Sequence, residues 1–371
     1  MAINLEMPRK LEAVIEKAHQ GAAEMLRPIS RKYDLAEHAY PVELDTLATL
    51  FEGISEANTI SFAGTEAFRD SDQGPKGNIN GGNMSALLNA LEIAWGDIAL
   101  LLSVPRQGLG NAAISGVATD EQLERLGRNV WAAMAITEPS FGSDSAAVST
   151  TAVLDGDEYV INGEKIYVTA GSRATHIVVW ATLDKSKGRA AIKSFIVPRE
   201  HPGVTVERLE HKLGIKASDT AAIRFDNVRI PKENLLGSPD IEVEKGFAGV
   251  METFDNTRPI VAAMAVGVAR AALEELRTIL TEAGVEISYD KPAHAQSAPA
   301  AEFLRLEADW EAGYLLTVRS AWQADNGIPN SKEASMGKAK AARVASDITL
   351  KAVEMAGTTG YSEQTLLEKW A

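Results

Sequence analysis

The sequence predicts an α+β protein in which a β domain separates two α-helical regions. Residues 5–130 carry apolar residues at helical spacing, and the same spacing returns from residue 246. Between them, residues 149–228 contain short alternating runs bounded by turn dipeptides. We therefore expect an N-terminal helical domain over residues 1–132, an antiparallel β-barrel domain over residues 133–240 and a C-terminal helical bundle over residues 241–371.

The N-terminal region is expected to be helical apart from one long loop. Residues 86–102 form an apolar segment of the kind that lies inside a bundle, whereas residues 69–83 are rich in Gly, Asn and Asp and indicate a surface loop. Thr119 followed by Gln122 predicts a capping box, because each side chain can satisfy a backbone N–H at the start of a helix. That helix is expected to end near residue 128.

The β domain is predicted from alternation and from two turn dipeptides. Asp155-Gly156 and Asn162-Gly163 lie between short β-branched runs, a combination that favours tight hairpin turns. The expected strands cover residues 149–154, 158–161, 165–169, 175–183, 190–197, 204–209 and 221–228.

The C-terminal bundle is expected to contain long helices over residues 246–283, 299–326 and 331–355, with a loop at 288–299. The last residues, LLEKWA, lack the Gly or polar cap that usually ends a helix. We therefore expect the native chain to continue beyond Ala371, so that the bundle lacks its last helix here.

Composition excludes several classes of function. Lys and Arg number 37 against 51 Asp and Glu, a formal net charge of −14, which disfavours nucleic acid or acidic lipid as a partner. The absence of cysteine excludes disulfides and thiolate metal sites and fits a reducing compartment. No signal peptide is visible, and residues 263–280, the nearest approach to a membrane span, are interrupted by charges. A cytoplasmic protein without a membrane span is expected.

Several common catalytic signatures are missing: HExxH, a P-loop, GxSxG, and GxGxxG after a strand. The histidines are scattered along the sequence, and we interpret them as surface or core residues, so that no metal site is expected. They are His19, His38, His176, His201, His211 and His294.

Two segments could hold a planar ligand. Residues 134–144, MAITEPSFGSD, lead apolar residues into a polar turn whose hydroxyls and backbone N–H groups suit ring carbonyls or phosphates, although such a turn can be only a turn. Residues 162–172, NGEKIYVTAGS, place Tyr167 and Thr169 on one face of a strand. A ring beside a hydroxyl can stack on a planar ligand; a cross-strand Tyr–Thr pair is the alternative.

With two further segments, these motifs give the chain a resemblance to acyl-CoA dehydrogenases. TEPSFGSD at 137–144 resembles the family's TEPxxGSD, and NGEKIYVTAG at 162–171 resembles its NGxKxWITN strand. FDNTRP at 254–259 and GTTGYSEQTLLEKWA at 357–371 resemble two later motifs, so the likeness runs almost end to end. It implies a β barrel between helical domains, the cofactor FAD, and α,β-dehydrogenation of an acyl-CoA thioester in lipid catabolism, with electrons passing to an electron-transfer flavoprotein.

The resemblance also implies roles for individual residues. Those expected to bind FAD are Met134, Ile136, Thr137, Gly142, Ser143, Tyr167, Val168 and Thr169, with Tyr167 in place of the family's Trp. Those expected to contact acyl-CoA are Ser143, Asp255 and Arg258.

The catalytic base departs from the family pattern. One family position for the glutamate falls on Thr257, which has no carboxylate, and the other would lie beyond Ala371. Glu252 precedes Thr257 by five residues, about 140° around a helix, and would face elsewhere. No catalytic residue is therefore identifiable in residues 1–371.

A second departure concerns the surface that completes a neighbour's FAD site in the family's homotetramers. Glu286 stands where the family's RxxFG motif has Arg, and Asp290 where it has Gly; Glu354 replaces a Gln and Thr358 a Gly. Carboxylates against a diphosphate would repel it. We expect a heterotetramer in which a related chain supplies the Arg, with a homotetramer as the alternative. An acyl-CoA oxidase, a flavin monooxygenase and a non-catalytic partner subunit are the competing functions.

Overall fold

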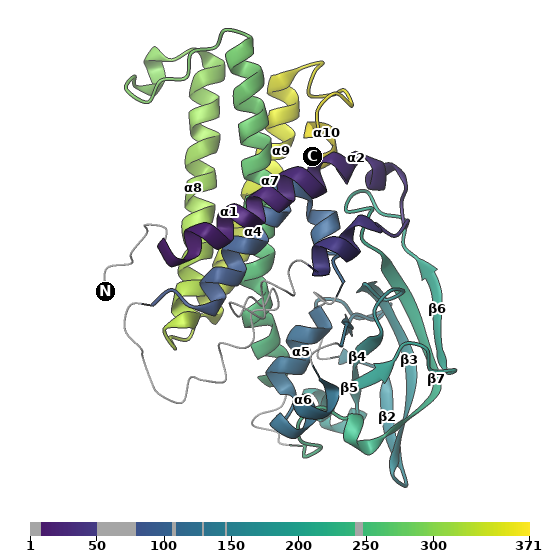
Figure 1. The fold of residues 1–371 in the computed structure, drawn as a ribbon. Helices are drawn as coiled ribbons and strands as arrows, with labels where there is room; N and C mark the ends of the chain where they lie inside the picture. Colours follow the sequence, from purple (N-terminus) through teal and green to yellow (C-terminus); the bar gives the residue numbers. More distant parts are fainter. Residues whose placement is uncertain (1–8, 50–78, 106–108, 128–129, 145–146, 242–247) are drawn as a thin grey trace. The chain divides into compact units, whose positions relative to one another are not determined.

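The computed structural model describes residues 9–49, 79–105, 109–127, 130–144, 147–241 and 248–371 (Figure 1). These residues form two compact units. The helical unit contains the described residues of 1–35, 54–101 and 258–371, and the β unit contains those of 36–53 and 102–257. Helices from both ends of the sequence thus belong to one unit, and the expected domain boundaries at residues 132 and 240 stay predictions.

The long helices of the C-terminal region run alongside one another in Figure 1 and share one core. The helices that contribute to the helical unit are α1 (Arg9–Gly21), η1 (Ala22–Leu26), α2 (Arg27–Leu35), α4 (Gly82–Leu101), α7 (Ala248–Glu282), α8 (Ala298–Asp325), α9 (Ser331–Ala356) and α10 (Leu367–Trp370). The three long helices expected over residues 246–283, 299–326 and 331–355 are confirmed as α7, α8 and α9. In α10, Leu367 is buried in the core shared with α7, α8 and α9. A 2.6 Å ion pair from Lys369 to Asp97 joins the same helix to α4.

Helix α4 is the buried centre of the helical unit. Apolar residues on all of its sides pack against α1, α7 and α8, and its carboxylate Glu92 is paired by two hydrogen bonds from Arg270. A Cβ placed on Gly267 of α7 would lie only 2.3 Å from the Leu91 carbonyl oxygen. The two helix backbones can therefore approach this closely only because residue 267 is glycine.

By length and composition, α4 could cross a membrane, but 83% of its apolar window is buried inside the protein. The expectation that no apolar segment is long enough to span a membrane, and that residues 263–280 come nearest, was wrong. The reason is that α4 carries only Glu92 and Asp97 as charged residues, both buried. Core helices pass the same test, so this finding is weak evidence for a membrane span.

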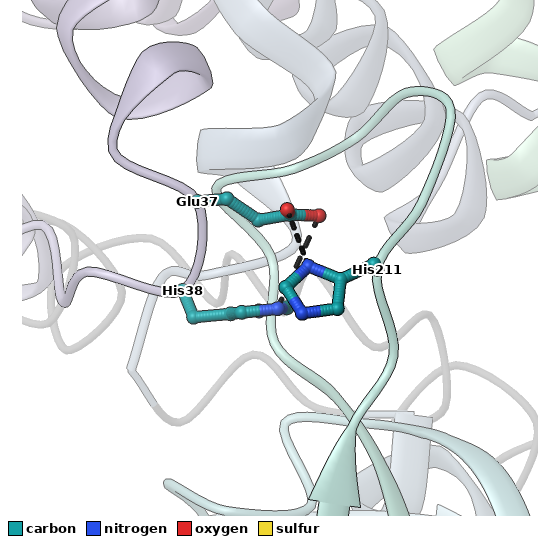
Figure 2. A group of neighbouring side chains, drawn as sticks. All are labelled: Glu37, His38 and His211. Atoms are coloured by element: carbon teal, nitrogen blue, oxygen red, sulfur yellow. Dashed lines mark hydrogen bonds and ion pairs between the residues drawn. The ribbon is translucent and has the colours of Figure 1, made fainter.

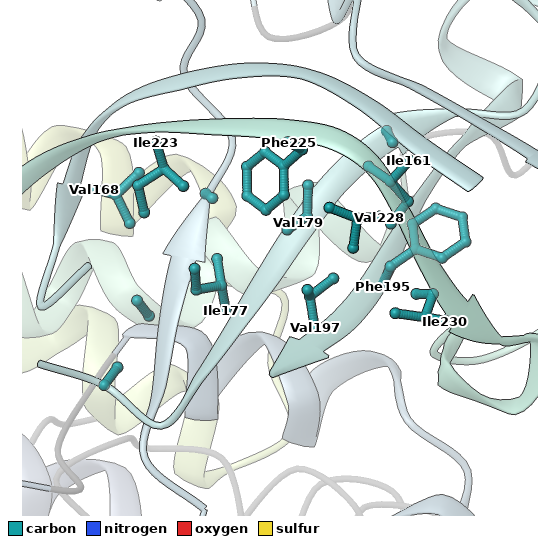
Figure 3. Packing of buried hydrophobic residues seen from close by; sticks show 14 of the residues in the cluster. Ile161, Val168, Ile177, Val179, Phe195, Val197, Ile223, Phe225, Val228 and Ile230 are labelled. Carbon is teal, nitrogen blue, oxygen red and sulfur yellow. The ribbon is translucent and has the colours of Figure 1, made fainter. Parts of the chain in front are cut away.

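The β unit is built on a sheet that forms a half-barrel. Its strands are β1 (Ala132–Ala135), β2 (Thr151–Asp155), β3 (Glu158–Thr169), β4 (His176–Thr182), β5 (Ile192–Pro198), β6 (Val204–Leu209) and β7 (Thr220–Pro231). The order is β1-β4-β2-β3-β7-β6, and β5 pairs with the other side of β4. Figure 3 shows apolar residues of β3, β4, β5 and β7, among them Ile161, Val179, Phe195 and Phe225, packed into one core.

Most of the expected β structure is confirmed. The strands predicted from residue 175 onward match β4 to β7 within three residues at each end. The expected hairpin is also present, with Asp155 as the last residue of β2 and Gly156-Asp157 as the two-residue turn to β3. The pairing is not wholly antiparallel, because β1 runs parallel to β4. Strand β1 itself was not expected.

The predicted turn at Asn162-Gly163 was wrong. These residues lie inside β3, which runs unbroken to Thr169 along β7. Between the Ile161–Val228 and Gly163–Phe225 pairs, β7 carries an extra residue, and Asn162 Oδ1 accepts a 2.8 Å hydrogen bond from the Asn227 N–H there. The dipeptide therefore lies opposite a β-bulge rather than in a hairpin turn.

The remaining helical expectations are confirmed where the structure describes them. Helices α5 (Leu109–Val117) and α6 (Asp120–Leu126) precede the sheet, and Thr119 and Gln122 form the expected capping box. Of the loop expected at residues 69–83, residues 69–78 lie outside the described residues, and Gly82 and Asn83 already belong to α4.

Candidate active site

The segment 134–144 leaves strand β1 and enters a tight turn. Glu138 and Phe141 exchange backbone hydrogen bonds of 3.0 and 3.1 Å, which close the turn. Thr137, just before it, is half-buried, whereas Gly142 and Ser143, just after it, are exposed. The turn therefore presents hydroxyls and backbone groups to its surroundings.

The turn is supported by a buried carboxylate, that of Glu138. The Glu138 side chain is 2% exposed and accepts hydrogen bonds from the backbone N–H groups of Ser149 and Thr150, at 2.8 and 2.9 Å, and from both of their hydroxyls. A buried charge is tolerated only when it is paired and hydrogen-bonded, and Glu138 meets both conditions.

The ion-pair partner of Glu138 is Lys165, in the middle of β3. Its ammonium group is fully buried, lies 2.8 Å from Glu138 Oε1 and donates at 3.1 Å to the Ile136 carbonyl. One residue later, the Ile166 N–H donates to the Thr137 carbonyl at 2.9 Å. The two segments that sequence analysis selected separately are thus joined by a buried ion pair and a backbone hydrogen bond.

The pair carries opposite charges at neutral pH. Burial raises the pKa of the Glu138 carboxyl. The Lys165 ammonium and the neighbouring hydroxyls lower the pKa by more than burial raises it, so that it is about 2. Burial lowers the pKa of Lys165 to about 8, although Glu138 opposes the shift. Neither residue was assigned a role from the sequence, although a lysine at an inward position of a strand signals a buried partner.

Tyr167 lies on a second bulge, this time in β3. Lys165 pairs with Ile223 and Val168 with Ala221, so β3 has one extra residue here. Tyr167 takes a left-handed backbone conformation with φ 56°, which is uncommon for a residue with a large side chain and often marks a functional site.

The bulge turns the Tyr167 ring outward. Tyr167 is 61% exposed, and Val168 beside it is 1% exposed, whereas Thr169 is half-buried. This pattern fits the expected common face for Tyr167 and Thr169, with Val168 beneath them. An exposed aromatic ring suits a planar group that needs a stacking surface.

The fit of these residues to a flavin can be judged from their chemistry. The half-buried Thr137 hydroxyl, the exposed turn at Gly142 and Ser143, and the Tyr167 ring supply donors, acceptors and an apolar face. Met134 and Ile136 are half-buried on the segment that enters the turn. These groups fit an isoalloxazine ring, and the individual roles stay predictions.

The residues expected to contact acyl-CoA lie on helix α7. Asp255 and Arg258 are half-buried and three residues apart, which places them on neighbouring turns of one face. Thr257 is 8% exposed. The side chain of Glu252 lies outside the described residues, so the structure adds no candidate for the base.

The four departures expected at the oligomer surface lie at exposed or partly exposed positions. Glu286 is 74% exposed and pairs with Lys291 at 2.8 Å, and Tyr289 donates its hydroxyl to Glu307. Glu354 is 69% exposed and pairs with Lys351; Asp290 and Thr358 are exposed. The segment thus presents carboxylates where the resemblance would require a cation.

Comparisons with known proteins agree with this geometry. The family model "Acyl-CoA dehydrogenase, middle domain" matches residues 133–228, and "Acyl-CoA dehydrogenase, C-terminal domain" matches residues 244–371. The short-chain specific acyl-CoA dehydrogenase of Rattus norvegicus mitochondria is 37% identical over 64% of this chain, and the match spans only 56% of that protein.

Two further relatives are matched over more of their length. The caffeyl-CoA reductase–Etf complex subunit CarC of Acetobacterium woodii is 34% identical over 79% of this chain and 77% of that protein. The butyryl-CoA dehydrogenase structure from Megasphaera elsdenii is 27% identical, with a TM-score of 0.84 over 99% of this chain and 93% of that one.

Proposed function

This chain belongs to the acyl-CoA dehydrogenase family, whose members are FAD-dependent oxidoreductases, and we propose that it oxidises the α,β bond of a short acyl-CoA thioester. The observation that carries the proposal is the joining of segments 134–144 and 162–172 through Glu138 and Lys165. The chemistry that FAD supplies when bound is acceptance of the β hydride.

The chain's own residues hold and orient the reactants in this proposal. When FAD is bound, Thr137 and the backbone at Gly142 and Ser143 would hydrogen-bond the isoalloxazine. Met134, Ile136, Tyr167, Val168 and Thr169 would line it. Ser143, Asp255 and Arg258 contact the acyl-CoA, where a guanidinium suits an anionic ligand. The acceptor of the α proton is not assigned to a residue of this chain, because Thr257 has no carboxylate.

The short acyl group and the electron acceptor are supported by named relatives. The rat and Megasphaera proteins are a short-chain and a butyryl-CoA dehydrogenase, and the Acetobacterium protein is a subunit of a complex with Etf. We propose an electron-transfer flavoprotein as the acceptor and fatty-acid degradation as the setting. The cysteine-free composition supports a reducing compartment, and we propose the cytoplasm.

A heteromeric assembly is proposed from the charge of one surface. Glu286, Asp290 and Glu354 present carboxylates where a neighbour's diphosphate would lie. Like charges in close contact cost several kcal/mol. A related chain with an Arg at the corresponding position would remove this repulsion.

Anaerobic reduction of the bound flavin tests the activity. The purified complex is mixed with butyryl-CoA, with longer acyl-CoA thioesters and with free butyrate, and flavin absorbance is followed. Bleaching by the short thioester, with reoxidation by an electron-transfer flavoprotein faster than by oxygen, is expected. Reoxidation by oxygen at least as fast as by the flavoprotein would indicate an oxidase and contradict the proposal.

Replacement of Tyr167 by alanine is expected to weaken FAD binding about 10-fold, because a stacked aromatic pair contributes roughly 0.5–1.5 kcal/mol beyond its buried area. The Tyr167→Phe variant keeps the ring and should retain affinity near wild type. Leu213→Ala removes an exposed apolar side chain of the β unit outside both segments and serves as the control. Equal FAD affinities for Tyr167→Ala and Leu213→Ala, measured by titration of the FAD-free complex, would exclude stacking on Tyr167.

A further inference from the structure

We propose that Glu37, His38 and His211 form a binding site for a divalent metal ion of the zinc type. Their donor atoms all lie within 4.8 Å of one another. Figure 2 shows the three side chains converging from two segments of the β unit, Glu37 and His38 from the stretch after α2 and His211 from the loop after β6. None of the three residues belongs to segments 134–144 or 162–172, and the proposal does not depend on the proposed function.

The geometry suits a small ion with few ligands. Glu37 Oε2 lies 2.8 Å from His211 Nδ1, and Glu37 Oε1 lies 4.0 Å from His38 Nε2. Ligand atoms of a tetrahedral zinc ion, bound at about 2.1 Å, are roughly 3.4 Å apart, so the observed separations bracket that value. Two imidazoles and one carboxylate form a known zinc ligand set that leaves one position for water.

His38 supplies the second observation. Both of its ring nitrogens are buried, and neither has a hydrogen-bond partner among the described residues. Buried polar atoms are nearly always paired, so an unpaired buried imidazole beside a carboxylate needs an explanation. A metal ion bound at Nε2 would provide one.

The backbone holds His38 in this position at some cost. Its φ of 69° is in the left-handed region, which is uncommon for a residue other than glycine and is often found at ligand sites. The Arg173 guanidinium donates to the His38 carbonyl at 3.2 Å, and the His38 N–H donates to the Lys216 carbonyl at 3.4 Å. The ring is thus placed by interactions that other residues provide.

The carboxylate is held in a similar way. The Lys212 N–H donates to Glu37 Oε1 at 3.0 Å and ties the loop after β6 to the segment that carries Glu37. Two cations lie near the cluster, and both are engaged: Lys212 Nζ donates to the Ser218 carbonyl, and Arg173 lies 3.5 Å from Asp219. Asp219 offsets the charge of Arg173, and the Lys212 ammonium is directed to a carbonyl rather than to Glu37.

This proposal departs from the interpretation of the histidines as scattered surface or core residues. His38 and His211 are far apart in sequence, but their rings lie 5.2 Å apart between centroids. No spacing motif connects them, so nothing in the sequence indicates a shared site. A bound ion would cross-link two distant segments of the β unit.

Titration of the purified full-length protein with Zn²⁺ after chelator treatment tests the site. Calorimetry should show one Zn²⁺ per chain, and Co²⁺ should give the visible absorption of a low-coordinate site. Because the His211 side chain is 84% exposed, His211→Ala is expected to fold normally. It should weaken Zn²⁺ binding by at least about 100-fold, the upper end of what even outer-sphere partners contribute.

Two further variants complete the test. Glu37→Gln should weaken binding to a similar degree, and His294→Gln, which removes an exposed histidine of the helical unit, should bind Zn²⁺ like the wild type. Zn²⁺ should also raise the melting temperature of the wild type and of His294→Gln, but not of His211→Ala. Absence of binding to the wild type, or binding that survives both His211→Ala and Glu37→Gln, would overturn the proposal.

Discussion

Replacement of Glu138 by glutamine is expected to destabilise the protein by about 3–5 kcal/mol, because it leaves the Lys165 ammonium buried without a countercharge. Lys165 is 0% exposed, and Glu138 is its only ion-pair partner within the described residues. The loss should also lower FAD occupancy, since the pair joins the two segments proposed to contact the flavin. Chemical denaturation followed by fluorescence measures the stability term.

Glu164→Gln is the matched control for this prediction. It makes the same chemical change one residue before Lys165, at an exposed position of β3, and should alter stability by no more than about 0.5 kcal/mol. Combining Glu138→Gln with Lys165→Met should recover part of the loss, because an apolar side chain of similar length removes the unpaired charge. A loss below 1 kcal/mol in Glu138→Gln would contradict the structural role of the pair.

The same carboxylate predicts how stability depends on acid. Its pKa is about 2 in the folded protein against an ordinary value of 4.5, so the unfolded chain binds more protons between these values. The stability that Glu138 contributes is therefore complete above about pH 5 and is lost as the pH falls toward 2. We expect about 2 kcal/mol of this contribution to disappear between pH 7 and pH 3. Glu138→Gln should lack that part of the acid dependence.

Replacement of Gly267 by alanine is expected to cost about 3 kcal/mol or more, because the new Cβ would lie 2.3 Å from the Leu91 carbonyl oxygen. The obstacle is backbone, so α4 and α7 must separate and lose packing along the buried core of the helical unit. The gain of helix propensity from Gly to Ala, about 1 kcal/mol, does not offset this loss.

Gly313→Ala in α8 should have the opposite sign. There the nearest atom to an added Cβ lies at 3.7 Å, an ordinary contact. The substitution should therefore stabilise the protein by up to about 1 kcal/mol. Thermal and chemical unfolding of the two variants, compared side by side, tests the packing; equal effects of the two would show that the close approach at Gly267 is not limiting.

The elements that the sequence predicted well are those with a clear local pattern. Strands β4 and β5 are short, nearly continuous apolar runs, and β6 and the second half of β7 alternate. Helices α7 to α9 carry long helical patterns. Strand β1 has only four residues, none of them β-branched or aromatic, so no strand signal was present. Asn162-Gly163 misled because a dipeptide that favours hairpin turns also fits opposite a bulge, and the bulge depends on the distant Asn227.

Candidate site residues were predictable from motifs but not from spacing. Thr137 and Tyr167 were selected because their segments resemble family motifs, and the structure joins those segments through Glu138 and Lys165. The simple strand alternation that relates Lys165 to Tyr167 is broken by the bulge between them. Lys165 is buried and Tyr167 exposed for that reason, a difference that no local pattern encodes.

The flavin content and mass of the purified chain test the central proposal, that the chain carries flavin-facing segments but does not complete a neighbour's site. Purified alone, the chain is expected to retain little flavin. Co-expressed with a related chain that has the missing Arg, it should form a heterotetramer with one flavin per two chains. A homotetramer of this chain alone with one flavin per chain would contradict the proposal, because the carboxylates at Glu286 and Asp290 would then be compatible with a neighbour's FAD.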